Sequence, residues 1–220
     1  MGLRETKKLA TRQQIADVAM RLFALRGFER VTVAEVAAEA GVSEKTVFNY
    51  FPTKEDLFYD EVPERARLLA ATIRDRASGE SVVAALRRLQ VSECGRLCNP
   101  GFAAFARVIE ESPALQAKEL EIMSFFAQAV FEALVEEGID VRDARSAAGL
   151  LVSVHRQFFR TARAQALAGR HGPAAVRRLR SDLERAYALL EHGLGGLEAH
   201  AGTDGGGRRK SSVRSVRSGS

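Results

Sequence analysis

Residues 32–58 read TVAEVAAEAGVSEKTVFNYFPTKEDLF, and this stretch decides the fold. Thr32 and Glu35 have the Thr-x-x-Glu spacing of a capping box, which satisfies two free amides at a helix start. Gly41 follows the first apolar stripe, where a left-handed residue that ends a helix costs glycine least. Ser43 is a good N-cap for the next helix. The stretch therefore predicts two short helices joined by a tight turn.

The second of these helices has a buried side and a polar side. Val47 and Phe51 lie four residues apart, so they point in one direction. The polar and aromatic side chains left to face outward are Lys45, Thr46, Asn49 and Tyr50. A short helix with such a face after a tight turn is typical of a helix-turn-helix that enters the DNA major groove.

The flanking sequence is also helical in pattern. Thr11 and Gln14 have capping-box spacing, so we expect the first helix to run from about Thr11 to Arg26. Thr53 is expected to cap a helix from Lys54 to about Arg76, with a kink or break near Val62. The reason is that Pro63 removes a backbone donor.

The remaining sequence predicts further helices and a polar tail. Helix-start signals recur down to residue 173, and alternating β-branched runs are missing, so the predicted fold class is all-α. The expected starts are Ser81, Asn99-Pro100, Ser112-Pro113, Asp140 and Gly172-Pro173. From residue 201 the chain is rich in Gly, Ser and Arg, and a segment that buries so little apolar surface is expected to be disordered.

The composition argues against a membrane or secreted protein, and the net charge gives little support for a polyanionic partner. The net charge is +5, but the tail holds five basic residues against one acidic residue, so the rest is nearly neutral. No run approaches the about 18 apolar residues of a membrane span, and the N-terminus lacks the apolar region of a secretory signal. We therefore expect a cytoplasmic protein. The sequence has no recognised catalytic, phosphate-binding or metal-binding motif, so no enzyme activity, metal or cofactor is expected.

The N-terminal residues resemble the DNA-binding domain of the TetR family of bacterial transcription regulators. The matching pieces are IADVAMRLFALRGF (residues 15–28) and the stretch 32–58, and the resemblance covers about residues 12–59. It implies a DNA-binding domain at residues 1–53 with three helices and a helix-turn-helix. A helical ligand-binding and dimerisation domain would follow at 54–200, with the tail at 201–220. The implied function is a regulator, commonly a repressor, that binds a pseudo-palindromic operator in double-stranded DNA as a homodimer.

The resemblance also implies which residues meet DNA. The expected contact residues are Thr32, Ser43, Lys45, Thr46, Phe48, Asn49, Tyr50 and Lys54. Thr32 and Lys54 fit phosphate contacts near helix starts. Lys45 stands where the family often has a small residue, and Phe48 where tyrosine is frequent, so a hydroxyl contact is replaced by packing on a sugar or a thymine methyl.

Two roles are expected in the second domain. The resemblance implies that the last two helices form the dimer, and the apolar positions proposed for it are Leu150, Leu151, Val154, Val176, Leu179, Leu183 and Leu190. An ordinary intramolecular core face is the alternative. A small apolar or amphipathic ligand is the second expected partner, and the residues proposed to line its site are Phe102, Phe105, Ile109, Met123, Phe126, Val130, His155, Phe158 and Phe159.

Each part of the ligand hypothesis has a simpler alternative. An aromatic stripe at helical spacing is more often plain core, and His155 could be an interior histidine with its hydrogen bonds satisfied. Cys94 and Cys98 lie one helical turn apart, either as a redox pair or as small buried apolar groups. A helical protein-interaction module remains the alternative to a DNA-binding regulator.

Overall fold

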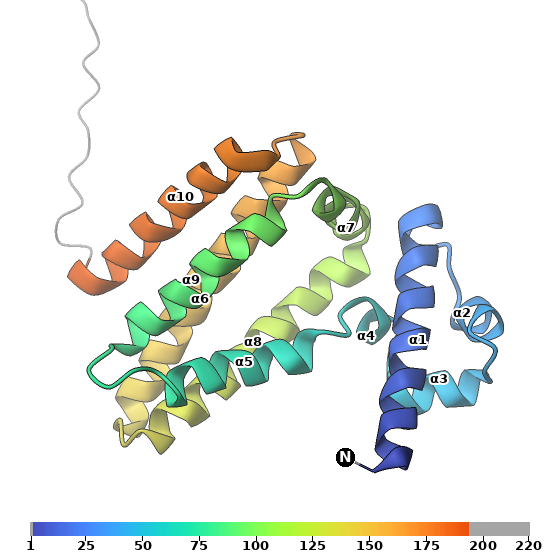
Figure 1. Ribbon diagram of the computed structural model, residues 1–220, viewed down its shortest axis with the longest axis horizontal. Coiled ribbons are helices and arrows are strands. Elements are labelled where there is room, and N and C mark those ends of the chain that lie inside the picture. Colours follow the sequence, from blue (N-terminus) through green and yellow to red (C-terminus); the bar gives the residue numbers. More distant parts are fainter. Residues whose placement is uncertain (1, 194–220) are drawn as a thin grey trace, which may run out of the picture.

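The computed structural model describes residues 2–193, and over that range every regular element is a helix. The helices are α1 (Leu3–Arg26), α2 (Val33–Glu39), α3 (Glu44–Tyr50), α4 (Lys54–Phe58), α5 (Val62–Arg74), α6 (Val82–Leu97), α7 (Pro100–Glu110), α8 (Pro113–Glu136), α9 (Val141–Leu167) and α10 (Gly172–His192). Figure 1 shows α1–α3 as a head beside a larger bundle of α5–α10. The predicted all-α fold class is confirmed.

Local capping fixes the helix-turn-helix. The Thr32 hydroxyl accepts a hydrogen bond from the Glu35 amide at 3.2 Å, and a Glu35 carboxylate oxygen accepts one from the Thr32 amide at 2.8 Å. Gly41 has φ 67°, a conformation that glycine adopts without a Cβ clash. The Ser43 hydroxyl then accepts from the Thr46 amide and starts α3. Both predicted caps are confirmed.

The start of the first helix was predicted wrongly. α1 begins at Leu3, and Thr11 lies inside it, where its hydroxyl donates to the Lys7 carbonyl at 3.0 Å. The preceding residues contain strong helix formers and no glycine or proline after Gly2, so the helix extends through the capping-box pattern.

The predicted break before Pro63 is confirmed and is sharper than a kink. α4 ends at Phe58, and α5 starts at Val62 with Pro63 in its first turn, where the missing amide costs no hydrogen bond. Tyr59–Glu61 therefore form a short hinge between two helices.

The bundle is built around α8 and α9. α5 and α9 pack on α8, while α10 packs on α6 and α9. Cys94 and Cys98 are buried free thiols in this core, and burial raises the pKa of both, to about 11 for Cys94. Thiols with raised pKa are weak nucleophiles, which fits the small-apolar interpretation of this pair.

The head and the bundle share apolar side chains. Phe58 packs against Phe23 and Phe28 of the head, and its ring also stacks on Phe105 of α7 at 4.7 Å between centroids. Ile109 is likewise part of the head cluster. α4 thus belongs to the head's core, which continues beyond the boundary predicted at residue 53.

Polar contacts reinforce this junction. The Ser112 hydroxyl donates to the Glu29 carboxylate at 2.6 Å, and the Tyr59 hydroxyl donates to the Leu115 carbonyl at 3.1 Å. No helix within residues 2–193 has both the length and the apolar character of a membrane span. The tail predicted at 201–220 lies outside the described residues.

Candidate DNA-binding and ligand sites

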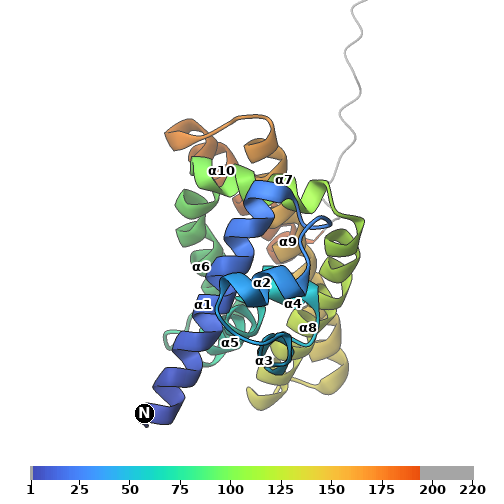
Figure 2. The same cartoon turned by 90° about the vertical axis from the view of Figure 1, so that its right-hand side faces the viewer.

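α3 presents a mixed polar and aromatic face to solvent. Val47 and Phe51 are fully buried in the head, so the helix is anchored along one side. Lys45, Phe48 and Asn49 are exposed on the other side, with the Phe48 ring 48% exposed. Figure 2 views the molecule with α1, α2 and α3 in front of the bundle. An unpartnered phenyl ring on an anchored helix is suited to contact a sugar or a base methyl.

Thr46 and Tyr50 were expected to face outward and are only partly exposed. The Thr46 hydroxyl lies 2.8 Å from the Ser43 hydroxyl, which itself caps α3. Tyr50 packs against the head cluster through part of its ring. Thr46 and Tyr50 therefore each make a contact within the head and leave part of the side chain exposed to solvent.

Two expected phosphate contacts have intramolecular partners. The Glu35 carboxylate accepts a hydrogen bond from the Thr32 amide and pairs with Arg26 at 2.6 Å. These contacts, of which the backbone hydrogen bond has the largest effect, lower the pKa of Glu35 to about 2. The Lys54 ammonium lies 4.1 Å from the Phe28 ring centroid, and burial lowers its pKa. A phosphate at either place would compete with these contacts.

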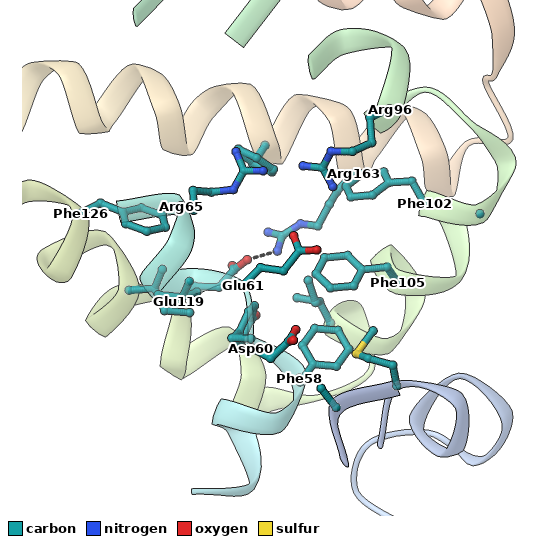
Figure 3. Close-up of a pocket in the computed structure, with 18 of the residues that line it drawn as sticks. Phe58, Asp60, Glu61, Arg65, Arg96, Phe102, Phe105, Glu119, Phe126 and Arg163 are labelled. Carbon is teal, nitrogen blue, oxygen red and sulfur yellow. Dashed lines mark hydrogen bonds and ion pairs between the residues drawn. The ribbon is translucent and has the colours of Figure 1, made fainter. Parts of the chain in front are cut away.

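A cavity of about 480 Å³ lies where the head meets the bundle. Its walls come from α1, the Tyr59–Glu61 hinge and α5–α9, so it touches both parts of the molecule. Figure 3 shows Phe58, Phe102 and Phe105 on one side of it. On the head side the cavity is lined by Gln13, Ala16, Asp17 and Met20 of α1.

Most of the predicted ligand residues meet at this cavity. The lining includes Phe102, Phe105, Ile109, Met123, Phe126, His155 and Phe159. Val130 and Phe158 do not line it, because both point into the bundle core. The α1 residues, the hinge and the charged wall were not predicted, since no periodicity within one helix indicates which other helix will face it.

The charged residues of the wall are largely paired. Arg163 pairs with Glu119 across α9 and α8, an interaction drawn in Figure 3. Arg65 donates to both carboxylate oxygens of Glu93 at 2.7 and 2.8 Å. Asp60 is half-buried, and burial raises its pKa to about 6 although Arg12 opposes the shift.

His155 has an unusual environment in this wall. Its side chain is 2% exposed, and neither ring nitrogen has a hydrogen-bond partner among residues 2–193. The Phe126 and Phe159 rings lie 5.3 and 4.9 Å away between centroids. Burial and then the nearby Arg65 charge lower the pKa of His155 to about 3, so the ring is neutral at physiological pH. The alternative of an interior histidine satisfied by the protein does not hold in the described structure.

The predicted dimer positions divide into two groups. Leu151, Val154, Leu179 and Leu183 are buried within the single chain, so they fill its own core. Leu150 is 58% exposed on α9, while Val176 and Leu190 are half-buried on α10. Periodicity identified the apolar stripes but could not separate inner from outer positions, because both helices carry apolar residues on more than one side.

The head sequence matches a model of the bacterial regulatory proteins of the tetR family over residues 15–60. This range spans the buried stripe of α1, the helix-turn-helix and α4. The head is a DNA-binding domain of the TetR type. The match supports a DNA-binding transcription regulator, and it includes the helix-turn-helix formed by α2 and α3.

Two curated regulators illustrate how the TetR-family similarity is distributed. TcmR of Streptomyces glaucescens is 27% identical over 154 residues, 64% of this chain and 67% of that protein. LuxR of Vibrio harveyi is 52% identical over 54 residues, 24% of this chain and 26% of that protein. The match to LuxR thus covers about a quarter of each protein. Identity is high only over a short segment.

A solved structure of a transcriptional regulator shares the fold over most of this chain. FadR from Bacillus subtilis, in complex with stearoyl-CoA, aligns with a TM-score of 0.50 and 22% identity, covering 84% of this chain and 99% of that one. At this identity the likeness concerns the fold alone.

His155→Phe should make the protein less sensitive to acid. The unfolded chain binds a proton at His155 near pH 6.5, whereas the native ring does so only near pH 3. Between these values protonation favours unfolding, so wild-type stability falls with decreasing pH by up to about 1.4 kcal/mol per pH unit from this group. The variant should lack that slope, measured as the difference in urea unfolding free energy at pH 7 and pH 4.5. An identical loss in both proteins would refute the assignment.

Proposed function

We propose that the protein is a one-component repressor: a homodimer that binds a pseudo-palindromic operator and responds to a small molecule in the head–bundle cavity. The observation that carries the DNA part is the anchored α3, with Lys45, Phe48 and Asn49 exposed together. Operator binding would place its action in the cytoplasm, with bacterial DNA.

The three exposed side chains suit different parts of the duplex. Lys45 is a flexible cation for a phosphate or a guanine edge, and Asn49 can pair with an adenine edge. Phe48 supplies apolar contact without a hydroxyl. We propose that Thr46 and Tyr50 contact DNA with their exposed edges, while Ser43, Thr32 and Lys54 mainly hold the head in shape.

Lys45→Ala should weaken operator binding about tenfold, because one cationic contact to DNA is lost. The slope of log affinity against log salt should also become shallower by about one. The measurement is fluorescence anisotropy on a DNA fragment selected by the wild-type protein from a random pool, at several salt concentrations.

The matched control is Arg67→Ala on α5. Arg67 is exposed and pairs only with its neighbour Glu64, so its loss removes the same charge away from α3. Arg67→Ala should bind like wild type. Equal affinities for all three proteins would show that α3 is not the recognition helix.

The dimer proposal rests on the outer faces of α9 and α10. These consecutive antiparallel helices pack together and leave Leu150 and Leu189 exposed, 58% and 40% respectively. Small residues Ser146, Gly149 and Ser153 surround Leu150 on α9 and permit close approach of another helix. We propose that a second copy covers this surface through a two-fold axis, so that two heads read two half-sites.

Leu150→Glu should convert the dimer to a monomer. A two-fold interface contains each residue twice, so the change buries two carboxylates in place of two leucines. Leu120→Glu on α8 is the control, since Leu120 is also 58% exposed but lies on another helix. Sedimentation velocity should give the mass of two chains for wild type and Leu120→Glu, and of one chain for Leu150→Glu. A wild-type monomer, or a dimeric Leu150→Glu protein, would overturn the proposed surface.

The proposed sensing role rests on the position of the cavity. A molecule in it would touch Met20 and Asp17 of α1, the hinge and α7–α9 at once. A ligand in this space would favour one orientation of the head relative to the bundle over another. If DNA binds best to a different orientation from the one that the ligand favours, ligand and DNA binding are coupled.

A further inference from the structure

The inner wall of the cavity is mostly apolar, with the Arg65 guanidinium lying over the Phe159 ring at 5.2 Å from its centroid. Phe126, Phe159 and Met123 line it, and His155 lies between the two phenylalanine rings. His155 is therefore the only polar side chain in this part of the described lining that is almost fully buried.

Both nitrogens of His155 lack a partner in the described chain. Buried polar groups without a partner are rare in folded proteins, and each one calls for a physical explanation. The neutral ring offers one N–H donor and one acceptor nitrogen. A bound molecule whose oxygen reached one of these buried nitrogens would satisfy the ring, and it would be held by a directional contact in the mostly apolar part of the lining.

The remaining wall does not favour an anion. Arg163 is paired with Glu119, and both Arg65 and Arg96 are paired with Glu93, Arg96 at 3.7 Å. Asp17, Asp60 and Glu61 add carboxylates on the head side, and Figure 3 shows Asp60 and Glu61 facing the same space as Arg163. The three arginines of the lining are thus all engaged by carboxylates, and the four carboxylates of the lining outnumber them, so a further anion is not favoured.

We propose that the cavity binds an uncharged, largely apolar molecule whose carbonyl or hydroxyl oxygen hydrogen-bonds to His155. This inference rests on the proposed sensing function and specifies the chemistry of its ligand. A carbonyl accepts from the imidazole N–H, and a hydroxyl uses either nitrogen. Aromatic rings at Phe102, Phe105 and Phe159 favour a ligand with a flat apolar body, because ring pairs gain from offset stacking.

Four small probes of one shape test the proposal. Benzophenone has a carbonyl between two phenyl rings, benzhydrol a hydroxyl there, diphenylmethane a methylene, and diphenylacetate a carboxylate. Binding to the full-length protein without DNA is measured by isothermal titration calorimetry. For wild type, diphenylacetate should bind at least about tenfold more weakly than benzophenone, as burying an unpaired charge costs more than burying a ketone.

Variants at His155 separate the hydrogen bond from simple filling of space. His155→Phe should lower the affinity for benzophenone and benzhydrol about tenfold, because their oxygen loses its hydrogen-bond partner. The affinity for diphenylmethane, which has no oxygen, should change less than about twofold. His155→Gln restores a donor and should recover part of the preference. His192→Phe makes the same replacement at an exposed histidine on α10 and should leave all four affinities unchanged.

Several outcomes would overturn the proposal. They are failure of benzophenone to bind, parallel losses for benzophenone and diphenylmethane in His155→Phe, and tight binding of diphenylacetate. A wild-type protein that binds operator DNA but gives one of these results overturns the ligand chemistry alone. A protein that discriminates the probes as expected but binds no DNA overturns the repressor proposal instead.

Discussion

The stacking of Phe58 on Phe105 is the contact on which the rest of the arrangement depends. Phe58 ends α4, packs in the head against Phe23 and Phe28, and meets α7 at 4.7 Å. Because the same ring also lines the cavity, the head core, the bundle and the proposed ligand site share one side chain. A molecule bound in the cavity would therefore contact the same packing that holds α3 in the head.

The parts that could be predicted from sequence are those with local causes. Thr32 with Glu35, Gly41 and Ser43 act within a few residues, so their spacing is enough to predict the helix-turn-helix. Pro63 likewise predicted the break between α4 and α5. α1 was the exception, since a capping-box pattern at Thr11 does not stop a helix when the residues before it also favour one.

The site was less predictable because it depends on which helices meet. Apolar spacing indicated Phe102, Phe126 and Phe159, but it could not exclude Phe158, which lies next to Phe159 on α9 and points into the core. The contribution of α1 to the cavity could not be predicted, because nothing in its sequence indicates that it packs next to α7 or the hinge. For His155, sequence indicated burial, whereas the lack of a hydrogen-bond partner depends on the surrounding helices.

The central claim is that operator DNA and a cavity ligand are coupled through the head–bundle junction. Coupling is reciprocal, so DNA must change ligand affinity by the factor with which the ligand changes DNA affinity. The most direct measurement is the affinity of benzophenone for the wild-type protein, free and saturated with its selected operator. If the two sites are coupled in this way, the DNA-bound protein binds benzophenone more weakly than the free protein, by about fivefold or more. Equal affinities in the two states would contradict it.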